Sequence, residues 1–239
     1  PFNPIDPATG MPVPFTAAVT DIDPFDRNIS QDFDGKETLE EFGASITLDM
    51  DFDNFALKSI SSYRTHDYFQ SYDADNTELA ITLRETPEDF DSWGQELRLT
   101  SVGEGPLDWI VGINYYGQKT VNEFASILNN DTLVNQGLFD FIIGFPGATA
   151  FFTGFGILTP PFGETRSIGK TDLDSYAVYG HGVWHVNERL NVEVGVRYTY
   201  EQKDFDFEQT STAANTLLGL VAIPATTSET NFDAVTPSF

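Results

Sequence analysis

Apolar and polar side chains alternate along this chain with a period of two residues. The clearest case is the segment Glu41 to Asp53, where Phe42 and every second residue up to Phe52 are apolar, whereas the residues between them are small or polar. Successive side chains of a β-strand point to opposite faces. The pattern therefore predicts a strand with one apolar face and one polar face.

The same period returns in segments of about ten residues, the length that strands of membrane β-barrels require. In Leu190–Lys203, for example, Val192, Val194 and Val196 alternate with charged and small residues. We therefore expect these valines to face lipid, and Glu193, Arg197 and Glu201 to face the lumen of a barrel. The remaining predicted strands are Phe55–Ser71, which alternates less regularly, Trp93–Ser101, Leu107–Gln118 and Asp172–Val186.

Short and long connections alternate between these segments. The short ones are Asp53–Asn54, Gly103–Pro106 and Asn187–Arg189, and the long ones are Asp73–Phe90, Glu123–Lys170 and Gln209–Asn231. Outer-membrane barrels have short periplasmic turns and long extracellular loops. The predicted fold class is all-β, an antiparallel meander forming part of an outer-membrane β-barrel, with about seven strands. We expect residues 1–38 and 209–230 to be extracellular loops, 39–208 to hold six strands, and 231–239 to begin a seventh.

Aromatic residues make up 14% of the chain and gather at the predicted strand ends. Trp and Tyr concentrate where a membrane protein crosses the interface between lipid and water. Two aromatic belts are therefore expected. The outer belt would contain Tyr63, Trp93, Tyr115, Tyr176, Tyr198 and Tyr200, and the periplasmic belt Phe52, Phe55, Trp109 and Trp184.

Charge and composition exclude several classes of function. The formal net charge of -25 argues against nucleic-acid binding, which depends on Lys and Arg. The absence of Cys excludes a disulfide scaffold and a thiolate zinc site. The most apolar stretch, Gly137–Phe162, contains Asp140 and several glycines and prolines, which oppose a continuous membrane helix.

Three sequence runs carry a family resemblance. WGQELRLTS (Trp93–Ser101) followed by LDWIVGINYY (Leu107–Tyr116) resembles a hairpin of TonB-dependent receptors. LDSYAVYGHGVWHVNERLNVEVGVRYTYEQKDF (Leu173–Phe205) is similar to a later hairpin of that family, and the terminal FDAVTPSF looks like the start of its next strand. The resemblance runs from about Leu39 to Phe239, in the family's order.

The resemblance implies active uptake of a scarce nutrient, such as an iron–siderophore complex, across the outer membrane of a Gram-negative bacterium. It implies as partners the TonB complex, contacted through a plug domain, the small-molecule nutrient complex, and outer-membrane lipid and lipopolysaccharide. It implies neither an enzyme nor a cofactor. The family's plug and its closing strands are not recognised in this sequence, so we interpret the chain as an internal part of the barrel.

Histidines and carboxylates raise the possibility of a metal site. His181 and His185 share a strand face, but four residues separate them by about 13 Å, too far to chelate one ion. Among the acidic clusters, the calcium-loop pattern begun by Asp49 lacks the required glycine and glutamate, since Asn54 and Ile60 hold those positions. We predict no metal site and interpret both histidines as polar residues facing the lumen. A looser divalent-cation role for the carboxylates, bridging to lipopolysaccharide phosphates, stays open.

The apolar stretch Gly137–Phe162 would be a long extracellular loop. Exposed aromatics there need a partner, so the loop is predicted to be a lid over the barrel mouth or a ligand contact. A loop packed only on itself, with no ligand role, is the competing interpretation. The candidate lid residues are Phe139, Phe141, Phe145, Phe151, Phe152 and Phe155.

Other classes of protein also fit parts of this strand pattern. A passive porin or a surface adhesin would also use a barrel. A soluble β-sandwich binding module would use the same alternation, although its turns would not alternate between short and long. Catalytic residues are not predicted, because no nucleophile elbow, phosphate-binding loop or zinc-protease helix is present in the sequence.

Overall fold

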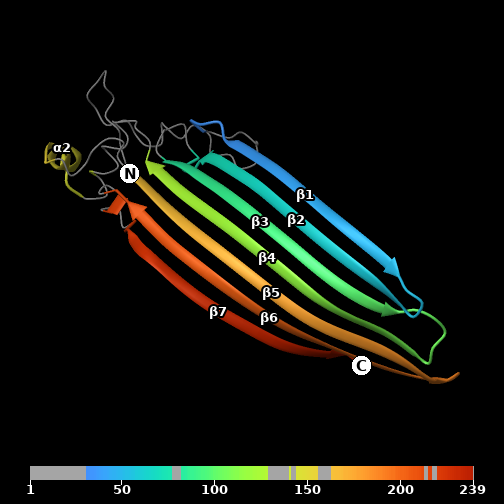
Figure 1. The fold of residues 1–239 in the computed structure, drawn as a ribbon. Coiled ribbons are helices and arrows are strands. Elements are labelled where there is room, and N and C mark those ends of the chain that lie inside the picture. Colours follow the sequence, from blue (N-terminus) through green and yellow to red (C-terminus); the bar gives the residue numbers. More distant parts are fainter. Residues whose placement is uncertain are drawn as a thin grey trace.

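The computed structural model describes residues 31–76, 82–128, 140, 144–155, 163–212, 215–216 and 220–238. In these residues seven strands form one open antiparallel sheet, each strand beside its neighbour in the chain (Figure 1). A short helix, α2, lies at the end of the sheet where β4 ends and β5 begins (Figure 1). The elements are β1 (Lys36–Asp51), β2 (Phe55–Asp73), β3 (Thr82–Ser101), β4 (Leu107–Leu128), α2 (Ala148–Gly154), β5 (Gly163–Asn187), β6 (Leu190–Ser211) and β7 (Ile223–Ser238).

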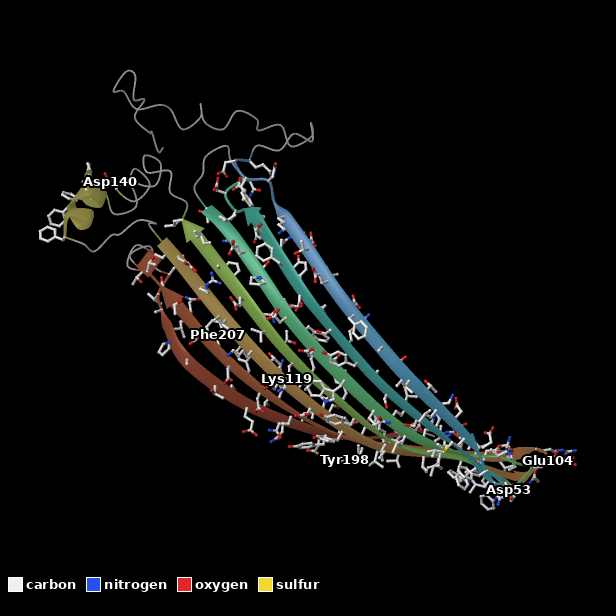
Figure 2. The ribbon with its side chains drawn as sticks, turned by 45° about the horizontal axis from the view of Figure 1, so that its top comes forward. Asp53, Glu104, Lys119, Asp140, Tyr198 and Phe207 are labelled. Carbon is white, nitrogen blue, oxygen red and sulfur yellow. The ribbon has the colours of Figure 1, made fainter. Side chains whose placement is uncertain are left out.

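The three predicted hairpins are confirmed. β1 pairs with β2, β3 with β4, and β5 with β6, all antiparallel and joined by the predicted short turns. Gly103 has a φ of 116°, a backbone conformation that glycine adopts without the penalty a side chain would bring. The short turns holding Asp53 and Glu104 lie at one end of the sheet, and Asp140 lies beyond the other (Figure 2). The fold class is therefore an antiparallel meander, as predicted.

Several strands are longer than the sequence predicts. β3 begins at Thr82 and not near Trp93, β5 begins at Gly163, and β7 begins at Ile223, within the stretch 209–230 that was expected to be loop. The added portions carry polar side chains on both faces, for example Arg84, Glu85 and Thr86 in β3. Backbone hydrogen bonds to neighbouring strands hold these portions. Because their two faces do not differ in polarity, the alternation that reveals a strand in the sequence is lost there.

This sheet has almost no hydrophobic core within the described residues. The buried apolar side chains are the alanines 125, 148 and 177, whereas large apolar side chains such as Ile46 and Val194 are 64% and 60% exposed. The two packed layers of a β-sandwich would have buried them, so the soluble-sandwich alternative does not fit. No helix in the described part of the chain is long and apolar enough to cross a membrane.

Candidate functional site

One face of the sheet is a continuous apolar band. Residues opposite each other in an antiparallel pair point to the same side, and the register aligns apolar residues in rows across the strands. One row joins Leu57, Leu99, Val111, Gly180 and Val196. A neighbouring row contains Leu48, Leu97, Ile113, Val178 and Tyr198.

Tyr and Trp side chains border this band on the side of the long connections, where the outer belt was predicted. The indole Nε1 of Trp93 donates to the Tyr115 hydroxyl at 3.0 Å, and Tyr115 donates to Asp174 Oδ1 at 2.6 Å. The Tyr63 hydroxyl donates to Asp91 Oδ1 at 2.5 Å. The rings therefore belong to the apolar band, while their polar atoms connect to carboxylates beyond it, as residues at a lipid–water boundary do.

Aromatic residues also border the band near the short turns. Phe52 and Phe55 stack with their ring centroids 4.6 Å apart, across the turn between β1 and β2. Trp184, near the end of β5, is 54% exposed. The predicted second belt is therefore present at this end of the sheet.

Carboxylates dominate the same face beyond the outer belt. Asp67 lies directly opposite Asp89 in the β2–β3 pair. The pKa of Asp89 is raised above its ordinary value, first by burial and then by the charges of Asp67 and Glu123. This part of the wall thus carries negative charges close enough to repel one another. Other carboxylates of this region are Asp91, Asp172, Asp174, Asp204 and Asp206.

The opposite face is polar and holds a hydrogen-bonded network centred on Tyr179. The Tyr179 hydroxyl donates to Glu96 Oε1 at 2.8 Å, and the Arg197 guanidinium lies 5.8 Å from the centre of the Tyr179 ring. Gly112 makes room for the ring, since a Cβ atom there would lie 2.5 Å from Tyr179 Cζ. One side chain thus links β3, β4, β5 and β6.

Both histidines near the short turns lie on the polar face. His181 Nε2 is 2.8 Å from Glu193 Oε1, and His185 Nε2 is 2.7 Å from Asp108 Oδ2. The Nδ1 atom of His185 is 2.9 Å from Asn191 Oδ1. The two histidines contact different side chains, and none of these side chains contacts both. In the described residues no three acidic, histidine or cysteine side chains are arranged to hold a metal ion.

The five residues predicted to face the lumen share this polar face. The register pairs Tyr179 with Arg197 and Ser175 with Glu201, and the Ser175 hydroxyl donates to Glu201 Oε1 at 3.2 Å. Arg197 Nε donates to the Thr199 hydroxyl at 3.1 Å. The full set is His181, His185, Glu193, Arg197 and Glu201. Within it His181 contacts Glu193, whereas the other three contact residues outside the set.

Aromatic rings also line the polar face toward the long connections. This feature was not predicted from the sequence. The His66 ring stacks on Phe90 with centroids 4.7 Å apart, and its Nε2 is 2.9 Å from Glu88 Oε1. The Arg84 guanidinium lies 5.4 Å from the centre of the Phe124 ring. Finding these pairs needs the register between strands, which the sequence pattern does not reveal.

The predicted lid is described in part. Phe145, Phe151 and Phe155 pack on one another, with centroids 6.5 Å apart for the first pair and 4.9 Å for the second, yet they remain 54%, 53% and 70% exposed. Asp140 Oδ2 accepts the Gly147 amide at 2.7 Å. Phe139 and Phe141 lie outside the described residues, as does the side chain of Phe152. The lid role stays a prediction.

Comparisons with known proteins agree with this geometry. Residues 2–239 match the family model "TonB dependent receptor-like, beta-barrel". The fold resembles the crystal structure of the ferric yersiniabactin uptake receptor FyuA from Yersinia pestis, with a TM-score of 0.53 and 17% sequence identity, over 83% of this chain and 25% of that one. No curated protein sequence matches the chain.

The chain belongs to the TonB-dependent receptor family, as part of its β-barrel. The family resemblance noted in the sequence is thereby confirmed. The family is one of receptors and transporters and not of enzymes. The chain spans a quarter of the solved receptor that it matches.

Proposed function

We propose that this chain forms part of the wall of an outer-membrane transporter that takes up a scarce nutrient with energy delivered by the TonB complex. The observation that carries the proposal is the single-layer sheet with two different faces, in a chain that matches the receptor barrel family along nearly its whole length. In this arrangement the apolar band faces lipid in the outer membrane of a Gram-negative bacterium, and the polar face lines the lumen.

The short turns near Asp53 and Glu104 then lie in the periplasm, and the long connections lie outside the cell. Within the lumen, His181, His185, Glu193, Arg197 and Glu201 line the periplasmic half. They face a plug domain elsewhere in the protein, through which TonB acts. The His66–Phe90 and Arg84–Phe124 pairs line the extracellular half, where an arriving nutrient complex first meets the wall.

An iron–siderophore complex is the proposed nutrient class. FyuA, a solved receptor of similar fold, is a ferric yersiniabactin uptake receptor. The aromatic and cationic pairs of the extracellular half of the wall suit a ligand with aromatic or anionic groups. The Phe cluster of the loop that contains α2 is proposed to cover the mouth and contact the same ligand.

Uptake of radioactive iron supplied with a panel of siderophores would test this function. Deleting the gene of the full-length protein should abolish uptake of at least one complex, and restoring the gene should restore it only in cells with an intact TonB system. Uptake that persists without TonB would indicate a passive porin. Unchanged uptake of every complex, together with loss of cell adhesion, would indicate an adhesin.

A further inference from the structure

The apolar face contains a trough along β5. Gly180 and Gly182 occupy two successive positions on this face. Strands β2, β3, β4 and β6 carry leucine or valine in the row of Gly180, whereas Trp109 and Val194 flank Gly182. The register places Gly180 between Val111 of β4 and Val196 of β6, and it places Gly182 beside Val194. Because glycine has no side chain, the floor of the trough is the backbone of β5 and its walls are the side chains of β4 and β6.

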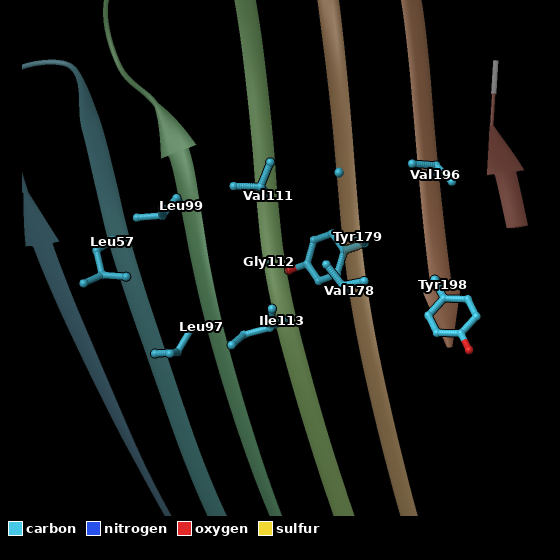
Figure 3. Close-up of a pocket in the computed structure, with 11 residues that line it drawn as sticks. Leu57, Leu97, Leu99, Val111, Gly112, Ile113, Val178, Tyr179, Val196 and Tyr198 are labelled. Atoms are coloured by element: carbon cyan, nitrogen blue, oxygen red, sulfur yellow. The ribbon is translucent and has the colours of Figure 1, made fainter. Parts of the chain in front are cut away.

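A hollow with a volume of about 720 Å³ lies over this part of the sheet. Its lining includes Leu99, Val111, Val178 and Val196, which come from four neighbouring strands (Figure 3). The rest of the lining is aliphatic or glycine apart from Tyr179 and Tyr198, so few groups there can form a hydrogen bond with a ligand. The hollow therefore selects for hydrocarbon.

A second hollow, of about 380 Å³, adjoins the first. The two share Ile113, Val178 and Tyr198, and the second extends to Tyr115 and Tyr176 of the outer belt. Together they form one groove, which we call the β5 groove, that runs from the belt toward the middle of the apolar band. At its belt end Tyr115 donates to Asp174, so polar groups begin where the apolar lining stops.

We propose that the β5 groove holds one acyl chain of an outer-leaflet lipid. The proposal rests on the membrane orientation given under Proposed function. The apolar lining matches a hydrocarbon tail, and the polar atoms at the belt lie at the depth of a headgroup. A tail seated there fills a hollow in a face that is otherwise open. In lipid the gain comes from close packing of the tail against the walls.

Gly180 provides a direct test, because a side chain can be added there without disturbing the fold. A Cβ atom at Gly180 would meet Val111 Cγ1 at 3.6 Å and the Ile110 carbonyl oxygen at 3.9 Å, both ordinary contacts. Gly180→Leu should therefore fill the groove and leave the strand intact. Ala44→Leu is the matched control, since it adds a similar side chain to the apolar face of β1, away from the groove.

The full-length receptor would be placed in vesicles of phosphatidylethanolamine and phosphatidylglycerol, with a trace of phosphatidylethanolamine bearing a photoreactive diazirine on its acyl chain. After illumination, mass spectrometry would locate the labelled residues. We expect labelling of Val111, Val178 and Val196 to exceed that of Ile46 severalfold. Gly180→Leu should abolish the excess and Ala44→Leu should preserve it.

Uniform labelling across the apolar face would overturn the proposal. So would an excess of label at the groove that survives Gly180→Leu. Crosslinks between two receptor copies at Val111 or Val196 would assign the groove to a second copy and would overturn it as well. Absence of label from the entire apolar face would instead contradict the membrane orientation. The test therefore distinguishes failure of the groove from failure of the proposed function.

Discussion

Glycines lie beneath aromatic rings at two places in the sheet. A Cβ atom at Gly112 would lie 2.5 Å from the Tyr179 ring, and one at Gly117 would lie 2.5 Å from Trp93 Cε2. Each ring belongs to a neighbouring strand and lies across the glycine backbone. Tyr179 faces the polar side and Trp93 the apolar side, so both faces use the same packing. The glycines are needed for the close approach of these rings.

Gly112→Ala should destabilise the barrel by about 1–3 kcal/mol, the usual effect of forcing a methyl group into a packed site. The added methyl displaces the Tyr179 ring and weakens its hydrogen bond to Glu96. Chemical unfolding of the full-length receptor in lipid vesicles measures this change. Gly180→Ala is the control, because its Cβ atom makes only ordinary contacts. Equal stability of the two variants would show that the ring does not depend on Gly112.

Asp89 should make stability depend on pH. Although its side chain is exposed, partial desolvation and then the charge of Asp67 raise its pKa above the ordinary value of 3.8. The folded protein therefore binds this proton more tightly than the unfolded chain does. Ionised Asp89 therefore destabilises the fold, and the penalty disappears as the pH falls through the raised pKa toward 3.8. Asp89→Asn should stabilise the receptor at pH 7. Below pH 3.8, where Asp89 is protonated in both states, the substitution should have little effect. A pH series of unfolding curves would reveal it, and an equal effect at every pH would contradict this account.

Residue faces could be predicted from the sequence, but residue partners could not. Alternation places Val194 and Glu193 on opposite faces without any knowledge of neighbours. The partners of His66, by contrast, depend on how β2 pairs with β3. Eight residues, 74–81, separate those two strands in the chain, so the sequence does not fix their register. The Tyr179–Gly112 contact was missed for the same reason.

At the level of the strand, the two faces of β1 should tolerate charge differently. Leu48→Arg places a cation on the apolar face, midway between the level of Tyr63 and that of Phe52. It should lower the free energy of unfolding in lipid by about 2–4 kcal/mol. Thr47→Arg places the same cation one residue away on the polar face and should cost much less. Folding titrations in vesicles would compare them. Similar losses for both variants would argue that neither face of β1 contacts hydrocarbon.

Gly195 is a poor position for such a comparison, although alternation suggests it as the polar neighbour of Val194. A Cβ atom there would collide with Ser238 Oγ and approach His181 Cδ2 to 2.9 Å. Any substitution at Gly195 would therefore disturb packing as well as polarity. Thr47 avoids this problem because its side chain is exposed.

The loop that contains α2 should matter for uptake and not for insertion. Removing residues 139–155 deletes α2 but no strand, so the full-length receptor should still assemble in the outer membrane. Because the deletion removes all six candidate lid phenylalanines, ligand binding or uptake should fall. Membrane fractionation and uptake assays on the same cells test both expectations. The lid hypothesis would be contradicted if the deletion variant failed to assemble and if, in the wild-type receptor, the loop phenylalanines were fully solvated and mobile.

Strand existence was predictable, but strand length was not. The amphipathic part of each strand lies between the two aromatic belts, where in the proposed orientation one face meets lipid and the other meets water. Beyond the outer belt both faces meet water, and the β3 stretch from Thr82 to Phe90 loses its alternation. The predicted long loop Asp73–Phe90 is therefore strand from Thr82 onward.

Across the whole molecule, side-chain chemistry divides the sheet into zones. The apolar band lies between the belts, carboxylates cover the same face beyond the outer belt, and paired charges such as Arg64 with Glu41 occupy the opposite face. A soluble protein would bury the band, whereas a barrel exposes it to lipid. This zoning, together with the family match, is the basis for assigning the chain to an outer-membrane wall.

Collision rates of nitroxide labels along β6 test that assignment most directly. Labels would be attached through single cysteines at positions 192–198, omitting Gly195, in the full-length receptor in vesicles. This stretch is convenient because the chain has no cysteine of its own. We predict that oxygen, which dissolves in lipid, collides most with labels at Val192, Val194, Val196 and Tyr198. A water-soluble nickel chelate should collide most with labels at Glu193 and Arg197. Nickel accessibility on both faces, or the absence of a two-residue period, would contradict it.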